Sequence, residues 1–362
     1  MHPTIPTILL FGIKSYERYV PNGLIKKNWL RKHLYLLPAV AALFKQIDWE
    51  EIQENHNRQA IITEINHLKS EVINRQVKIV LVLLISKQSP AIDLILNLFE
   101  YQADDPLFKD QTTKFCDECD ISPKCFFYIP IQNETQCHNA VLKIEAVMND
   151  MARNHYAFKA KLIKTLKDQL NKTTQNYLFV RHEFKLGFYH EIRQIHSTAL
   201  SHYKNAYTSL IEIRLNPMNC SEIKNIAALL NYKIIKMFFN LNVPLDAISY
   251  FKRHIEIFQN KFVSDQIRFE HFDWLSKQYL MFAELFDMAI ATFHLAPSAT
   301  HNPGVYYFES AVYLLKRRSS ALESLHQLNQ NEMDFASDIL AKHKDTDFIG
   351  QLPWFQNDSC KV

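Results

Sequence analysis

Short apolar runs alternate with amphipathic stretches along the first part of the chain, up to about residue 140. The run at 38–44 is compatible with a helix or a strand. A helix is expected over 50–75, because four apolar side chains recur there at helical spacing: Ile61, Ile65, Leu68 and Val72. The run at 78–85, KIVLVLLI, is continuous and partly β-branched, which is typical of a buried parallel strand.

The next segments extend this alternation. A helix is expected around 92–100, and the run at 125–130 is a further strand that stops at a proline. Strands and helices in this order predict right-handed βαβ crossovers and a small parallel sheet. We therefore expect a small α/β domain at 1–140, either whole or incomplete.

From about residue 141 the apolar period becomes helical, and no strand pattern recurs. Val141, Ile144, Val147 and Met151 form a stripe that steps by three or four residues, and Leu162, Leu166 and Leu170 continue it. The segment 171–174 reads as a helix break with a cap, and a second helix is expected from about 175 to 196.

Shorter helices follow, separated by proline or glycine. They are expected near 199–216, 222–240, 244–258, 267–294 and 303–315. Small and aromatic residues in the first of them resemble the packing positions of tetratricopeptide helices: Ala199, Tyr203, Ala206 and Tyr207. Paired helices at intervals of roughly forty residues indicate stacked repeats that bury their apolar faces on one another.

The fold class predicted from these patterns is mainly α. An α-solenoid of tetratricopeptide-like repeats at 141–318 follows the 1–140 domain, and a polar, weakly ordered tail occupies 319–362. The helix at 267–294 carries a wide aromatic face, and we expect Trp274 to lie in the repeat core between neighbouring helices.

Glycine content excludes several classes of enzyme. The chain has five glycines, and the nearest two, Gly12 and Gly23, are eleven positions apart. Phosphate-binding loops, dinucleotide fingerprints and nucleophile elbows all need glycines a few residues apart. We therefore predict no catalytic residue and no cofactor-binding residue. A net charge of +3 is too small to predict nucleic-acid binding.

The six cysteines contain one tight pair, Cys116 and Cys119, with Cys125, Cys137 and His138 nearby. Structural zinc favours two paired ligand sets, and Cys125 falls within the expected strand, so we predict a turn with ordinary thiols and no metal. No signal peptide is evident, which predicts reduced cytosolic thiols. The longest strongly apolar run, 79–85, is far shorter than the roughly twenty residues that span a bilayer.

Two further groups of polar residues have alternative interpretations. His190 and Glu191 begin a zinc-protease motif without its second histidine, since His196 lies about 240° further round a helix, so a solvated helix face is expected. A basic set is expected to be solvated too, although it suits anionic lipid or an acidic partner: Lys159, Lys161, Lys164, Lys167, Lys172, Lys26, Lys27, Arg31 and Lys32.

Several blocks of the chain resemble the foie gras domain family. They include 242–248 (NVPLDAI), 251–255 (FKRHI), 269–271 (FEH) and 274–278 (WLSKQ). The stretch 302–307, NPGVYY, resembles that family's His-Pro-Gly-x-Tyr-Tyr signature with asparagine in place of histidine. Upstream blocks that also fit are 21–23, 28–29, 32–33 and 178–182, so the resemblance spans roughly 20–315.

The resemblance implies a subunit of a transport protein particle complex in ER-to-Golgi vesicle traffic and autophagy. It implies a cytoplasmic protein on Golgi and ER–Golgi intermediate membranes that binds other subunits of the complex, and no nucleic acid. We expect a non-enzymatic scaffold. The alternatives are a peripheral membrane-surface binder that uses the basic helices, and an enzyme with a site on the N-terminal α/β domain, because ligands often bind at the carboxyl ends of parallel strands.

Overall fold

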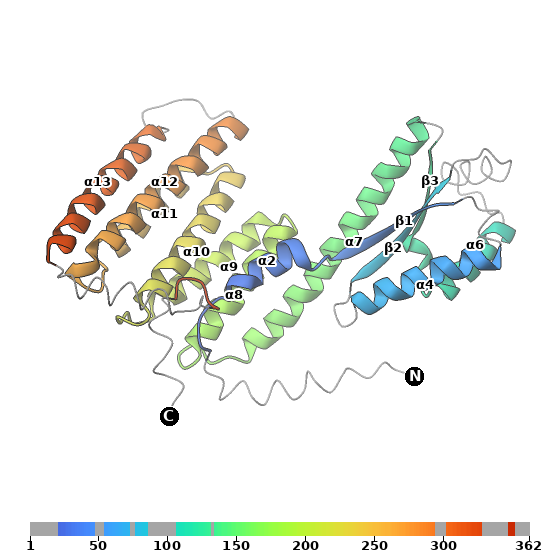
Figure 1. Ribbon diagram of the computed structural model, residues 1–362, viewed down its shortest axis with the longest axis horizontal. Coiled ribbons are helices and arrows are strands. Elements are labelled where there is room, and N and C mark those ends of the chain that lie inside the picture. Colours follow the sequence, from blue (N-terminus) through green and yellow to red (C-terminus); the bar gives the residue numbers. More distant parts are fainter. Residues whose placement is uncertain are drawn as a thin grey trace. The chain divides into compact units, whose positions relative to one another are not determined.

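The computed structural model describes residues 21–47, 54–72, 77–85, 106–131, 134–293, 302–327 and 347–351. These residues fall into two compact units. One contains the residues up to Leu30 and those from Ala160 onward, and the other is formed by Arg31–Lys159. Most of the described chain is helical, and a small parallel sheet lies near its N-terminal end (Figure 1).

The Arg31–Lys159 unit is built on three parallel strands in the order β1-β2-β3. They are β1 (Val40–Gln46), β2 (Lys78–Ile85) and β3 (Phe126–Pro130), and their register pairs Ala41 with Ile79 and Leu81 with Phe126. The two predicted strands are therefore confirmed, and the ambiguous run at 38–44 is a strand. Parallel pairing buries both faces of β2, which explains its unbroken apolar sequence.

Helices join these strands. α4 (Asn55–Glu71) lies between β1 and β2 in the sequence and buries Ile61 and Ile65, as their spacing predicts. α6 (Pro106–Glu118) and the 3₁₀ turn η3 (Pro123–Cys125) precede β3. The apolar pattern did not predict α6. The helix expected around 92–100 lies outside the described residues.

Two short helical elements precede the sheet, α2 (Lys27–Arg31) and the π-helical turn η2 (Lys32–Leu36). Within the described residues, seven longer helices follow it. They are α7 (Glu134–Asp168), α8 (Asn176–Ile192), α9 (His196–Ile211), α10 (Cys220–Asn240), α11 (Pro244–Phe258), α12 (Arg268–Phe293) and α13 (Gly304–Gln327), with a 3₁₀ turn, η4 (Asp265–Ile267), before α12. No strand occurs in the described part of 145–315, as predicted.

The helix breaks have local causes. Asn171 Oδ1 accepts backbone hydrogen bonds from Thr173 (2.9 Å) and Thr174 (3.3 Å), which turns the chain between α7 and α8. Gln194 and Asn242 adopt positive φ angles of 62° and 57° after α8 and α10. Pro244 then begins α11, where its missing N–H needs no partner.

Among the helices from α8 to α13, α9 packs on α8, α10 packs on α9, α11 and α12 both pack on α10, and α13 packs on α12 (Figure 1). Gly187 allows α8 to approach α9 closely, since a Cβ at this position would lie 2.6 Å from the Tyr203 ring. Further along the array, Phe251 of α11 stacks on Phe282 of α12 at 4.2 Å between ring centroids. The predicted aromatic core is confirmed, and Trp274 lies in it with 8% of its surface exposed.

A two-stranded strap joins residues far apart in the sequence. Lys26 and Phe348 form an antiparallel bridge, and the Ile349 amide donates to the Ile25 carbonyl at 2.9 Å. Arg181 of α8 donates to the Leu24 carbonyl, and Glu222 of α10 accepts from the Leu24 amide at 2.6 Å. These hydrogen bonds hold the strap, which consists of residues 22–27 and 347–351, against α8 and α10.

The predicted domain boundaries do not coincide with the ends of helices. α7 runs through residue 140, and α13 continues past 318 to Gln327. Within the expected polar tail, Phe348 is buried in the strap. The three-part division of the chain at 140 and 318 stays a prediction.

Candidate functional site

The last described helix, α13, has two different faces. Its inner face contacts α12 through small and aromatic side chains. Ser310 Oγ donates to the Ser276 carbonyl at 3.0 Å, and Tyr313 stacks on Tyr279 at 5.4 Å between ring centroids. The small serine side chains permit close approach of the two helices, so the inner face of α13 packs against α12.

The opposite face of α13 is apolar and exposed. Phe308, Leu315 and Leu322 recur every seven residues and are 67%, 65% and 46% exposed. Seven residues advance a helix by nearly two full turns, so the three side chains lie close to one line, about 120–160° round the helix from Ser310. We call these three residues the outer stripe. Such a heptad line is the pattern of a helix that packs against another helix.

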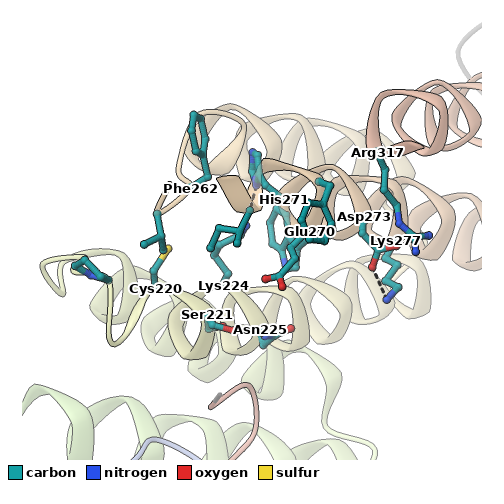
Figure 2. A pocket seen from close by; sticks show the side chains of 15 residues that line it. Cys220, Ser221, Lys224, Asn225, Phe262, Glu270, His271, Asp273, Lys277 and Arg317 are labelled. Atoms are coloured by element: carbon teal, nitrogen blue, oxygen red, sulfur yellow. Dashed lines mark hydrogen bonds and ion pairs between the residues drawn. The ribbon is translucent and has the colours of Figure 1, made fainter. Parts of the chain in front are cut away.

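A pocket of about 570 Å³ opens beside the N-terminal end of α10. We call it the Lys224 pocket. Figure 2 shows Cys220 and Lys224 on α10, with His271 and Glu270 on α12 and Phe262 on the loop between α11 and α12. Arg317 reaches its rim from α13. Three helices and a loop thus supply the lining.

Lys224 is buried at the wall of this pocket. Its Nζ lies 2.8 Å from His271 Nδ1 and 4.8 Å from the centroid of the Trp274 ring. His271 Nε2 lies 2.7 Å from the Gln259 carbonyl oxygen, which can only accept, so Nε2 carries the ring proton and Nδ1 accepts from Lys224. Burial lowers the pKa of Lys224 to about 8.

The charges nearer the solvent are paired with one another. Asp273 accepts from Lys277 at 2.7 Å, the interaction drawn as a dashed line in Figure 2, and from Arg317 at 3.1 Å. Burial, with the Lys224 charge next, lowers the pKa of His271 to about 4, so its imidazole is neutral at physiological pH.

Sequence reasoning did not select Lys224 as a site residue. The signal was present, because Lys224 adjoins Ile223 and Ala227 on the face of α10 that enters the core. A charged side chain on the apolar face of a predicted helix is a candidate for function, since it is buried at an energetic cost.

The predicted solvated face at His190 and Glu191 is wrong. Glu191 accepts from the Tyr203 hydroxyl at 2.6 Å and pairs with Lys233 at 2.9 Å, which ties α8 to α9 and α10. Burial alone would raise the pKa of Glu191, but Lys233 and the Tyr203 hydroxyl lower it overall. His196 begins α9, so it is not even on the same helix as His190.

The basic residues divide into two groups. Lys161 and Lys164 are exposed on α7, as predicted, and so are Lys26, Lys27, Arg31 and Lys32. Lys167 is different: its ammonium pairs with the buried Glu183 carboxylate at 2.8 Å, so it is part of the packing between α7 and α8. Lys172 pairs with Glu212 at the surface.

The cysteine cluster lies at the end of α6. Cys116 belongs to the last turn of this helix, Cys119 follows it, and Cys125 closes η3, so the expected turn is a helix end. Burial raises the pKa of Cys116 to about 11 and that of Cys119 to about 12, so both side chains are neutral thiols at physiological pH. In the described part of the chain no three metal-ligating side chains converge.

Two segments of the chain match protein-family models. Residues 15–137 match the model of the Trafficking protein particle complex subunit 11 N-terminal domain, and residues 219–350 match the Foie gras liver health family 1. The chain belongs to the family of proteins that carry these two domains. The Lys224 pocket and the outer stripe both lie within the second match.

Curated relatives agree with this assignment. The chain is 34% identical over 348 residues to Trafficking protein particle complex subunit 11 of Gallus gallus, and 33% identical to the proteins of that name from Bos taurus and Homo sapiens. The match covers 94% of this chain but only 29% of each relative.

Proposed function

We propose that this chain is a non-enzymatic scaffold whose outer stripe docks a helix of another protein. The observation that carries the proposal is the apolar heptad line of Phe308, Leu315 and Leu322 on the last helix of the packed array. A stable array buries such a line on a neighbouring helix. Large exposed apolar patches are otherwise rare on soluble proteins and mark interaction sites.

The architecture supports a repeat scaffold. α8 and α9 pack through Gly187, Ala199, Tyr203 and Ala206, the small-and-aromatic contact of tetratricopeptide-like pairs. α10 packs on α9, α11 and α12 pack on α10, and α13 packs on α12, which supports an α-solenoid over α8–α13 whose last described helix has an exposed outer face. The three-part organisation with boundaries at 140 and 318 belongs to the same proposal.

The relatives supply the biological setting of the proposal. They are named as subunits of the trafficking protein particle complex, so we place this chain in that complex, bound to its other subunits. It then acts in ER-to-Golgi traffic and autophagy, on the cytoplasmic side of Golgi and ER–Golgi intermediate membranes.

Two other functions have weaker support. In the described residues, no helix is long and apolar enough to cross a membrane, and beside the exposed lysines of α7 the apolar surface is small, formed by Phe158 and Leu162. An apolar hollow of about 660 Å³ lies beside β1, β3 and α7, but Glu145 is its only described acidic lining residue. Liposome flotation with and without anionic lipid tests the membrane function.

The scaffold proposal is tested with the variant Phe308→Ser/Leu315→Ser/Leu322→Gln. These side chains contact solvent, so we expect its melting temperature to stay within about 5 °C of the wild type, because each exposed substitution changes stability by about 0.5 kcal/mol or less. Association with the other complex subunits, measured by pull-down from purified components, should fall at least tenfold.

The matched control replaces exposed residues elsewhere on the same unit, Lys252→Ser and Lys161→Ser. It should bind like the wild type. Unchanged association of the outer-stripe variant would overturn the proposed docking face.

A further inference from the structure

The Lys224 pocket holds a buried ammonium group on which the Glu270 carboxylate acts only through space. No carboxylate of the described residues forms an ion pair with Lys224, whose hydrogen bond goes to the neutral His271 ring. A buried charge without an ion-pair partner is costly, and proteins retain one mainly where it binds something. The remaining N–H donors of Lys224 are available to a ligand in the cavity.

The other charges of the pocket compensate this one only in part. Asp273 is paired with Lys277 and Arg317, and the exposed Glu270 acts on Lys224 through its charge without forming an ion pair. The three basic lining residues thus exceed the two acidic ones by a single charge. Because the two carboxylates remain near the mouth, a dianion would meet more repulsion than a monoanion does.

The walls of the pocket are suited to an apolar molecule. Trp274 and Phe262 contribute aromatic rings, and Val263 and Ile267 contribute aliphatic surface from the loop that precedes α12. A volume of about 570 Å³ falls within the range of pockets that bind small molecules, roughly 300–1,000 Å³. Cavities of this kind combine an apolar body with one or two fixed polar contacts.

We propose that the Lys224 pocket binds a small organic monocarboxylate with an apolar body. The carboxylate accepts a hydrogen bond from Lys224, and the body lies between Trp274 and Phe262. His271 orients the ammonium group through its Nδ1 acceptor, which the hydrogen bond from Nε2 to Gln259 holds in place. This inference is independent of the outer stripe, whose residues do not line the pocket.

The experiment titrates the full chain with 3-phenylpropionate by isothermal titration calorimetry. The comparison ligands are its uncharged amide, acetate and phenyl phosphate. We expect saturable binding of the carboxylate, and at least tenfold weaker binding of the amide, which lacks the charge, and of acetate, which lacks the apolar body. Phenyl phosphate should also bind at least tenfold more weakly, because its second charge faces Glu270 and Asp273.

The decisive variant is Lys224→Met, which keeps the apolar stem and removes the ammonium group. It should bind 3-phenylpropionate at least tenfold more weakly than the wild type, whereas Lys252→Met, at an exposed lysine of α11, should bind unchanged. A circular-dichroism melt checks that Lys224→Met is folded. Equal binding by the two variants, equal binding of phenyl phosphate, or no saturable binding of 3-phenylpropionate would each overturn the proposal.

A spectroscopic measurement on the wild type keeps the test valid if Lys224→Met does not fold. In a ¹⁵N–¹H spectrum, 3-phenylpropionate should move the indole resonance of Trp274, assigned with Trp274→Phe, and leave those of the other three tryptophans in place. A shift of Trp29 of similar size, or no shift at all, would contradict binding in this pocket.

Discussion

Replacing Trp274 with alanine should destabilise the helical unit strongly. The centroid of its ring lies 5.6 Å from that of Phe258 and 5.5 Å from that of His254. Lys224 Nζ lies over the ring, 4.8 Å from its centroid. Truncating a buried large aromatic side chain costs about 3–5 kcal/mol. Loss of the cation–π contact adds about 0.5–2 kcal/mol. Since whole domains are stable by only about 5–15 kcal/mol, the variant should lose about a quarter or more of its stability.

The assay is urea unfolding followed by circular dichroism at 222 nm, a wavelength chosen for its usual helix signal. We expect the midpoint to fall with little change in the slope. Phe308→Ser is the matched control, because it removes an aromatic ring that is 67% exposed and should shift the midpoint little. A Trp274→Ala protein that unfolds like the wild type but no longer binds other subunits would refute the core placement and assign the ring to a partner site.

Buried titratable side chains lead to three further predictions. Burial lowers the pKa of His254 to about 3, so the unfolded state takes up a proton at this side chain before the folded state does. The free energy of unfolding should therefore fall as pH drops below about 6.5, by about 2 kcal/mol at pH 5. Urea titrations should show this loss in the wild type and not in His254→Leu. Lys224→Met should stabilise the protein by about 1–3 kcal/mol at pH 7, and this gain should shrink as pH rises from about 8 toward 10.5, where the ammonium penalty disappears. Glu191→Ala should lower stability by about 2–4 kcal/mol in the same assay, more than Tyr203→Phe, because it leaves the Lys233 ammonium partly buried and unpaired.

The sequence predicted those elements whose apolar pattern fits only one type of secondary structure. The run at 78–85 has no polar position after Lys78, and it is β2 with the same bounds. The run at 38–44 was ambiguous because seven residues suit either structure, and its pairing with β2 decides the matter. α6 was missed because its polar positions, such as Lys109, Asp110 and Gln111, leave no clear apolar stripe.

Side-chain interactions between helices were less predictable. A pattern along one helix shows which face is apolar but not which residue of another helix meets it. Glu191 read as solvated for this reason, although it is bound by residues 12 and 42 positions later in the chain. Lys224 was overlooked likewise, since its partner His271 lies 47 positions away.

The strap has a consequence for how the chain folds as it is synthesised. Leu24 has no exposed surface, yet the side chains that hold it, Arg181 and Glu222, emerge from the ribosome more than 150 residues later. The helical unit therefore closes only after the Arg31–Lys159 unit has been made, and Asp347 to Gln351 complete it last. A clone that begins at the start of the foie gras match, residue 219, lacks Arg181 and the segment that Glu222 binds, and it should aggregate on expression.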